Sequence, residues 1–226
     1  MTEGRWPTGI PAIDALLGGG LECDSLTELY GEGGTGKTVF ALALSVRALT
    51  EGRWVLYIDT EGVSPHRLAA TATGLPHEAM DRLLVVAPKD LEAQGRAVAR
   101  AAALARGAER PIGLVVLDSA THYYRLARTE EDEDEARRAL TEQIGQLAST
   151  ARSREIPVLF TNQVWRSLRE GTLEPLGGSF LNHAAKTILR FDRLDGDRRR
   201  AVLLKHRDLP ERSTVFRITE HGIEGA

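Results

Sequence analysis

The sequence has 226 residues and a mass of 24.7 kDa, with 42% hydrophobic and 27% charged residues, so it is long enough and apolar enough to bury a core. The net charge of −3 excludes a globally basic surface, and any surface for nucleic acid must therefore be local. The single cysteine, Cys23, excludes an internal disulfide and a cysteine-based metal cluster. The first residues carry no signal-peptide pattern, and no apolar stretch approaches the roughly 20 residues that span a bilayer. We expect a cytoplasmic protein with no part in the membrane.

Five short apolar runs alternate with helical patterns and predict a mostly parallel sheet flanked by helices, an α/β fold. The runs cover residues 26–30, 54–58, 83–86, 112–117 and 156–161. Before the last run, apolar residues recur at spacings of three and four between Ala136 and Ala151, which predicts a helix lying across the sheet. The acidic residues 130–135 then fall at the start of that helix, where the helix dipole favours negative charge.

Shorter β-like segments at residues 187–191, 201–204 and 214–218 follow Leu176, and a turn at Asp195-Gly196-Asp197 joins the first two. They predict a C-terminal antiparallel extension of the same sheet. Neither an internal repeat nor a low-complexity linker interrupts the chain. We therefore expect one domain over residues 1–226.

A glycine-rich loop between a predicted strand and a predicted helix has the sequence Gly31-Glu32-Gly33-Gly34-Thr35-Gly36-Lys37-Thr38 and matches the P-loop pattern at every fixed position. Its glycines allow backbone N–H groups to face phosphate oxygens at a helix N-terminus. We expect Lys37 to neutralise the β- and γ-phosphates and the Thr38 hydroxyl to bind Mg²⁺, with Val39 completing the nucleotide-binding segment. The sequence therefore predicts a site for ATP and Mg²⁺.

A second metal anchor is expected at Asp118, which ends the apolar run 112–117 as the second Walker motif does. In this interpretation the Asp118 carboxylate orients Mg²⁺ through water. A simpler alternative is that Asp118 caps the following turn together with Ser119.

Two further polar residues follow predicted strands, and the carboxyl ends of parallel strands line the ligand crevice of an open α/β sheet. Glu61 lies just beyond residues 54–58 and is a candidate to activate the attacking water. Gln163 follows residues 156–161 and is a candidate sensor of the γ-phosphate. The alternatives are a surface carboxylate without a role and an amide that caps a turn.

In this order the segments resemble the RecA-like recombinase superfamily, and within it the archaeal RadA/RadB branch. The segments that carry the resemblance are Thr8-Gly9-Ile10, residues 16–21, the loop at 31–38, Leu117-Asp118-Ser119-Ala120-Thr121, Thr161-Asn162-Gln163-Val164, Pro175-Leu176-Gly177-Gly178, residues 209–211 and residues 215–219. The resemblance implies a RecA-like ATPase core that uses ATP and Mg²⁺, with catalytic roles for Lys37, Glu61 and Gln163. It also implies that Arg67 stacks on adenine, although the segment before Arg67 is one residue shorter here.

Departures from the RadA pattern point to the short, RadB-like paralogues. Full recombinases carry an N-terminal helical domain and a linker with a Phe-x-x-Ala polymerisation motif, whereas the ATPase core here begins almost at Met1. Phe40-Ala41-Leu42-Ala43 has the same spelling, but it falls in the helix after the loop, where Phe40 is expected to pack in the core. The resemblance then implies an accessory factor for a RadA-type recombinase, with weak or absent ATP hydrolysis. The resemblance allows a homo-oligomer, but not a filament made through the usual linker. A Holliday-junction resolvase and a DNA polymerase are alternative protein partners.

Residues 164–171 are the main candidate for single-stranded DNA. Trp165 is suited to stack on a base, and Arg166 and Arg169 to bind phosphates. The alternative is that Trp165 anchors this loop to the core.

Two basic triplets are further candidates. Lys205-His206-Arg207 resembles a triplet that lies near the ATP site in RadB-like proteins. Its residues are suited to contact a γ-phosphate in the same chain or across a subunit interface, to bind DNA, or to form a solvated turn. Arg198-Arg199-Arg200 is a second basic patch, with a solvated turn as the alternative.

The sequence thus predicts an ATP-binding accessory protein of DNA repair and homologous recombination that binds single-stranded DNA and modulates a RadA-type recombinase. A KaiC-like signalling ATPase without DNA binding is the main alternative, because it shares the nucleotide motifs. A small P-loop kinase is a third, but no separate acceptor-binding domain or arginine-rich lid is recognisable.

Overall fold

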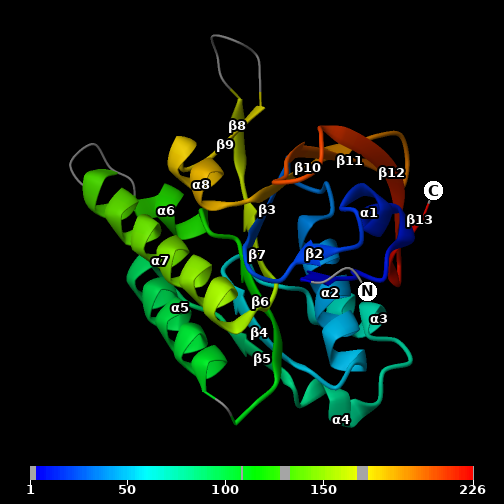
Figure 1. Ribbon diagram of the computed structural model, residues 1–226, viewed down its shortest axis with the longest axis horizontal. Coiled ribbons are helices and arrows are strands. Elements are labelled where there is room, and N and C mark those ends of the chain that lie inside the picture. The colour runs from blue at the N-terminus through cyan, green and yellow to red at the C-terminus, as the bar shows by residue number, and fades with distance from the viewer. Residues whose placement is uncertain (1–3, 108, 128–132, 167–172, 226) are drawn as a thin grey trace.

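The structure is a computed structural model that describes residues 4–107, 109–127, 133–166 and 173–225 (Figure 1). Its centre is a nine-stranded sheet with the order β13-β12-β11-β10-β3-β7-β6-β4-β5. The five predicted parallel strands are confirmed to within two residues at each end, as β3 (Leu26–Tyr30), β4 (Trp54–Asp59), β5 (Leu83–Val86), β6 (Ile112–Asp118) and β7 (Val158–Asn162). Every residue of β3, β6 and β7 is buried, because helices cover both faces of these strands.

The predicted antiparallel extension is also confirmed. Strand β10 (Thr187–Arg193) lies parallel to β3 on one side and antiparallel to β11 (Arg198–Lys205) on the other. Strands β12 (Arg212–Thr219) and β13 (Gly222–Gly225) continue the sheet. Strand β13 was not expected from the sequence, and Lys205 belongs to β11 itself instead of following it.

Helices form one layer on each face of the sheet (Figure 1). On one face lie α5 (Leu91–Arg106), α6 (His122–Ala127), α7 (Glu133–Arg154) and α8 (Ser179–Ala184). On the other lie α1 (Pro11–Leu16), α2 (Lys37–Thr50), α3 (Pro65–Thr71) and α4 (His77–Met80). Each layer packs on its own apolar cluster, and these clusters are the two halves of the core.

Helices α7 and α2 agree with their sequence patterns. The apolar residues of α7 between Ala136 and Ala151 are buried, and Glu133, Asp134 and Glu135 occupy its first turn. Residues 130–132 of the acidic run lie outside the described residues. In α2, Phe40 is fully buried and packs edge-on against Phe191 with ring centroids 5.5 Å apart, so its prediction as a core residue is confirmed.

Two small sheets lie beside the main one. Strand β1 (Arg5–Trp6) pairs with β2 (Leu21–Glu22), and β8 (Val164–Arg166) pairs with β9 (Leu173–Pro175). Figure 1 shows the β8–β9 hairpin projecting away from the main sheet next to α8. Because β8 begins two residues after β7 ends, the hairpin starts directly at the carboxyl end of a central strand.

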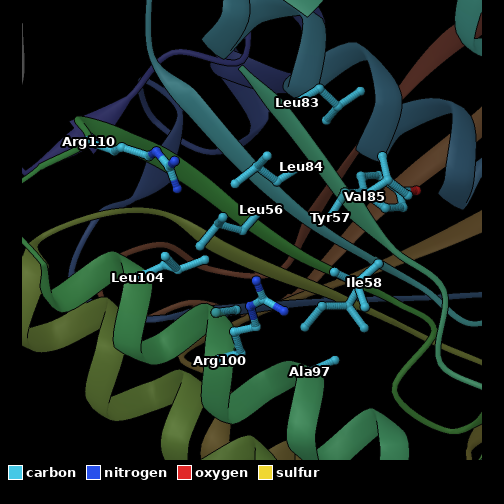
Figure 2. A pocket seen from close by; sticks show the side chains of 12 residues that line it. Leu56, Tyr57, Ile58, Leu83, Leu84, Val85, Ala97, Arg100, Leu104 and Arg110 are labelled. Atoms are coloured by element: carbon cyan, nitrogen blue, oxygen red, sulfur yellow. The ribbon is translucent and has the colours of Figure 1, made fainter. Parts of the chain in front are cut away.

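The nine-stranded sheet has two edge strands, β13 and β5, and β5 borders an apolar groove. The groove has a volume of about 480 Å³ and is lined by residues of β4, β5 and α5, with Arg100 and Arg110 at its sides (Figure 2). Val85 and Val86 of β5 are 50% and 42% exposed. In the part of the chain that the structure describes, no helix is long and apolar enough to cross a membrane.

Candidate nucleotide-binding site

The glycine-rich loop connects the carboxyl end of β3 to the N-terminus of α2. Gly36 caps the helix with φ 100°, a left-handed conformation that favours glycine. A Cβ at Gly36 would lie 2.3 Å from Cδ1 of Ile218, and one at Gly31 would lie 2.4 Å from the Phe191 carbonyl oxygen. The loop therefore needs glycine at these two positions, because it is packed directly against strands β10 and β12.

Side chains of the loop bind its own carbonyl groups. Lys37 Nζ donates hydrogen bonds to the carbonyl oxygens of Gly31 at 2.8 Å and Glu32 at 3.0 Å. Thr35 Oγ1 donates to the Glu32 carbonyl oxygen at 2.8 Å. Burial lowers the pKa of Lys37, and the nearby carboxylates of Glu61 and Asp118 oppose this shift. With these carbonyls occupied, N–H groups at the positive end of α2 are available for an anion.

Asp118 is buried at the end of β6 and is held by two hydroxyl groups. It accepts hydrogen bonds from Tyr57 at 2.8 Å and from Thr161. Burial raises the pKa of Asp118, and these hydrogen bonds oppose the rise because they stabilise the carboxylate. The Thr38 hydroxyl also acts to lower the pKa of Asp118, so the two predicted metal ligands lie near each other. A hydroxyl and a carboxylate are oxygen ligands of the kind that Mg²⁺ prefers, so the residues present fit this ion.

Glu61 and Gln163 are 102 positions apart in the sequence and meet at the site. Gln163 Nε2 donates to Glu61 Oε1 at 2.7 Å, and Ser119 Oγ donates to the same oxygen at 2.7 Å. The structure therefore brings the predicted water-activating carboxylate and the predicted phosphate sensor together. Their chemical roles remain predictions.

Asp59 was not singled out in the sequence, but it shapes the turn that carries Glu61. Its carboxylate accepts hydrogen bonds from the backbone N–H groups of Glu61 at 3.2 Å, Gly62 at 2.8 Å and Val63 at 2.7 Å. An aspartate followed by a glycine within three residues is a recognisable turn signal, so this role was accessible from the sequence.

A fully buried polar pair, Glu28 and Asn162, lies behind the site. Asn162 Nδ2 donates to Glu28 Oε1 and to the Leu176 carbonyl oxygen, both at 2.8 Å. Asn162 Oδ1 accepts from Thr121 Oγ1 at 2.7 Å, and Thr121 Oγ1 accepts from the Gln163 N–H at 3.2 Å. Burial raises the pKa of Glu28 to about 7, although Asn162 and Lys205 act in the opposite direction. Hydrogen bonds of this pair thus connect β3, the strand that precedes the phosphate-binding loop, to Gln163 and to the end of the β8–β9 hairpin.

Arg67 lies in α3, next to the strands that support the loop. Its Nη1 donates to the carbonyl oxygens of Thr219 at 3.0 Å and Glu220 at 3.2 Å, at the turn between β12 and β13. The preceding residue in β12 is Ile218, the neighbour of Gly36. Arg67 is therefore close to the loop, and its stacking on adenine remains a prediction.

The triplet Lys205-His206-Arg207 lies away from the phosphate-binding loop. Lys205 pairs with Ile188 near the start of β10, and its Nζ donates to the carbonyl oxygens of Asn182 at 2.6 Å and Ala185 at 2.8 Å. Arg207 forms ion pairs with Glu22 and Asp24, both at 3.0 Å, just before β3 begins. The loop follows the other end of β3.

The prediction that Lys205 and Arg207 bind the nucleotide of their own chain is therefore wrong, because β11 runs away from the loop. The side chain of His206 is buried, and its Nδ1 accepts from the Asp208 N–H at 3.1 Å. Contacts of this triplet with DNA or with a neighbouring subunit remain predictions.

The predicted DNA-contacting segment is only partly described. Trp165 and Arg166 belong to β8, opposite Glu174 and Leu173 of β9. Their side chains, and Arg169 as a whole, lie outside the described residues. Their binding to DNA therefore remains a prediction.

The triplet Arg198-Arg199-Arg200 is divided between the two faces of β11. Arg198 and Arg200 are exposed, and Arg200 pairs with Asp192 at 2.9 Å. Arg199 is only 8% exposed, so the prediction of one continuous basic patch is wrong for this residue. Side chains alternate between faces along a strand, which places Arg199 on the face that packs against α2.

Comparisons with known proteins agree over almost the whole chain. The sequence model of the Rad51 family matches residues 5–226. The DNA repair and recombination protein RadB of Thermoplasma acidophilum is 41% identical over 97% of this chain and 93% of its own length. The protein of the same name from Methanoculleus marisnigri is 42% identical over 99% of both chains. A crystal structure described as the RadB recombinase is similar with a TM-score of 0.80 at 36% identity, covering 97% of this chain and 98% of that one.

Proposed function

The chain belongs to the Rad51 family and has a RecA-like fold, and from that premise we propose that it is an ATP-binding accessory protein of DNA repair and homologous recombination. In this proposal a single ATPase core over residues 1–226 binds Mg-ATP and single-stranded DNA and modulates a RadA-type recombinase. The observation that carries the proposal is the convergence of Lys37, Asp118 and Glu61 beside the loop, at the carboxyl ends of β3, β6 and β4.

Each residue of the site has a task that its geometry supports. The N–H groups of the loop bind the phosphates, and Lys37 exchanges its bonds to the loop carbonyls for bonds to phosphate oxygens. Thr38 and Asp118 hold Mg²⁺, which neutralises charge on the phosphates when it is bound. Glu61 accepts a proton from the attacking water.

The contact between Gln163 and Glu61 supports weak hydrolysis. Gln163 and Ser119 both donate to Oε1 of Glu61, so protein hydrogen bonds occupy this oxygen in place of a water molecule. Oε1 of Glu61 loses one of these donors and can accept from the attacking water when the Gln163 amide turns to a γ-phosphate oxygen. Because Gln163 directly precedes β8, the same movement changes the hairpin that carries the predicted DNA contacts. In this way the nucleotide state is coupled to DNA affinity.

The groove beside β5 supports the binding of a protein partner. An edge strand offers unpaired N–H and C=O groups to an extended segment, and apolar pockets beside it accept side chains of that segment. We place the contact with the recombinase there, so that an extended recombinase segment adds to β5. In the sheet, β5 is four strands away from β3, the strand that leads into the phosphate-binding loop.

The test is a titration of labelled single-stranded oligonucleotide with the protein, with and without Mg-ATP, at two salt concentrations. Lys37→Ala removes the phosphate contact, and Lys89→Ala, an exposed lysine, is the control for loss of charge. We expect salt-sensitive DNA binding that changes with Mg-ATP in the unmodified protein and in Lys89→Ala, but not in Lys37→Ala. Nucleotide binding without any DNA binding at low salt would favour the KaiC-like signalling alternative.

A further inference from the structure

Arg199 is a buried arginine without a carboxylate partner. It is 8% exposed, and its Nε has no hydrogen-bond partner among the described residues. Its guanidinium donates only to backbone carbonyl oxygens, those of Arg198 at 2.8 Å, Gly196 at 3.1 Å and Gly34 at 3.3 Å. Within the described ranges no ion pair of Arg199 is found, although a buried cation is costly unless an anion compensates it.

Gly34 belongs to the phosphate-binding loop, so Arg199 contacts that loop from behind. Strands of the antiparallel extension support the loop at two more points, where Gly31 approaches the Phe191 carbonyl and Gly36 approaches Ile218. The contact of Arg199 with Gly34 joins residues 165 positions apart. The antiparallel strands thus pack against the side of the loop that faces away from the phosphates. Among the described residues of these strands, Arg199 is the only charged side chain that donates a hydrogen bond to the loop.

The hydrogen bond to Gly34 has a geometric consequence for the neighbouring N–H group. In a planar trans peptide the C=O of one residue and the N–H of the next point in opposite directions. Fixing the Gly34 carbonyl toward Arg199 therefore turns the Thr35 N–H away from Arg199, to the side where phosphates bind. The charge on the guanidinium also polarises this peptide, which makes the N–H a stronger donor.

We propose that Arg199 is a positioning residue of the nucleotide site: it orients the Gly34–Thr35 peptide for phosphate binding, and the bound polyphosphate is its missing counter-ion. The positive end of α2, Lys37 and Arg199 all surround one loop, so their charges are balanced when the phosphates are present. This inference rests on the proposed binding of Mg-nucleotide.

The variant that tests it is Arg199→Met, which removes the charge and the donors but keeps an unbranched side chain. Arg198→Met is the matched control, since it changes the adjacent, exposed arginine of the same strand. Arg199→Lys is the rescue variant, because it restores one charged donor. Dissociation constants for Mg-ADP and for inorganic tripolyphosphate are measured by titration calorimetry, and melting temperatures are measured without ligand.

For Arg199→Met we expect both dissociation constants to rise at least about tenfold, with the binding stoichiometry retained. Its melting temperature without ligand stays unchanged or rises, because an uncompensated buried charge is lost. Arg199→Lys recovers a large part of the affinity, and Arg198→Met binds like the unmodified protein. A residue needed only for folding would instead lower the melting temperature and leave the affinity of the folded fraction unchanged.

Two other results have distinct meanings. Arg199→Met that binds both ligands as tightly as the unmodified protein would overturn the inference alone. If the unmodified protein binds neither ligand and equals Lys37→Ala, the proposed nucleotide function fails and the inference fails with it.

Discussion

Among single residues, Tyr57 has the clearest supporting role in the proposed metal site. Its ring is buried in β4, and its hydroxyl donates to Asp118 at 2.8 Å, which fixes one carboxylate oxygen. Groups that orient a metal ligand without touching the ion typically change metal affinity by about 10–100-fold when they are removed. Tyr57 thus supports the metal site by orienting Asp118. It lies inside β4, whereas Glu61 lies beyond the end of that strand.

We predict that Tyr57→Phe weakens the Mg²⁺-dependent part of nucleotide binding by about tenfold, because Asp118 loses one of the donors that orient it. Binding of ADP in the presence of chelator should stay within about twofold, since the loop itself is unchanged. Titration of labelled ADP with and without Mg²⁺ measures both quantities. Tyr124→Phe, a change in another buried tyrosine, is the control. Equal weakening with and without Mg²⁺ would contradict the role assigned to Tyr57.

For individual elements, the sequence predicted best what depends on local pattern. The central strands β3, β6 and β7 were recognisable because they are buried on both faces, and the P-loop pattern located the phosphate site from the sequence alone. Arg198, Arg199 and Arg200 look alike in the sequence, so periodicity could not show which of them is buried. That outcome depends on a contact with Gly34, far away along the chain.

The placement of Lys205 is different, because the sequence contained the information needed. The chain reverses at Asp195-Gly196-Asp197, near the end of β10 that lies level with the loop. An antiparallel strand after that turn must carry the chain away from the loop. The predicted hairpin was therefore enough to place Lys205 at the opposite edge, whereas the resemblance alone suggested the ATP site.

At the edge strand β5, we predict that Val85→Asp weakens binding to a RadA-type recombinase at least about tenfold. A charge in the exposed apolar rim opposes docking of an extended segment, and edge strands commonly carry charges that block such pairing. Leu126→Asp is the control, because Leu126 is 62% exposed and lies in α6. Calorimetry or interferometry with purified recombinase measures the affinity, and nucleotide binding should be unchanged in both variants. Equal recombinase binding by Val85→Asp and the unmodified protein would remove β5 from the proposed interface.

For the whole molecule, the buried pair Glu28 and Asn162 connects parts that are distant in sequence. Glu28 stands in β3 at the centre of the sheet, and Asn162 links it to Leu176 at the end of the hairpin. A carboxylate in this place affects the free energy of unfolding through its protonation. Lys205, on the other side of Glu28, is the basic group whose charge favours the ionised form.

The sign of the pH effect follows from the raised pKa of Glu28, which is about 7 in the folded protein and 4.5 when the group is unperturbed. Between these values the folded state binds more protons than the unfolded state, so the contribution of Glu28 to stability falls as the pH rises from 4.5 to 7. At about 1.4 kcal/mol per pKa unit, the loss by pH 8 amounts to about 3 kcal/mol.

We predict that Glu28→Gln removes this loss, because a carboxamide is never charged and its oxygen still accepts the hydrogen bond from Asn162. The variant should exceed the unmodified protein in free energy of unfolding by about 3 kcal/mol at pH 8, and the difference should shrink toward pH 5. Urea denaturation at four pH values and constant ionic strength measures it, and all other titrating groups cancel in the difference. Glu78→Gln, an exposed change in α4, is the control for the loss of one carboxylate. A pH-independent difference for Glu28→Gln would mean that Glu28 stays ionised in the folded protein, with Lys205 and Asn162 outweighing its burial.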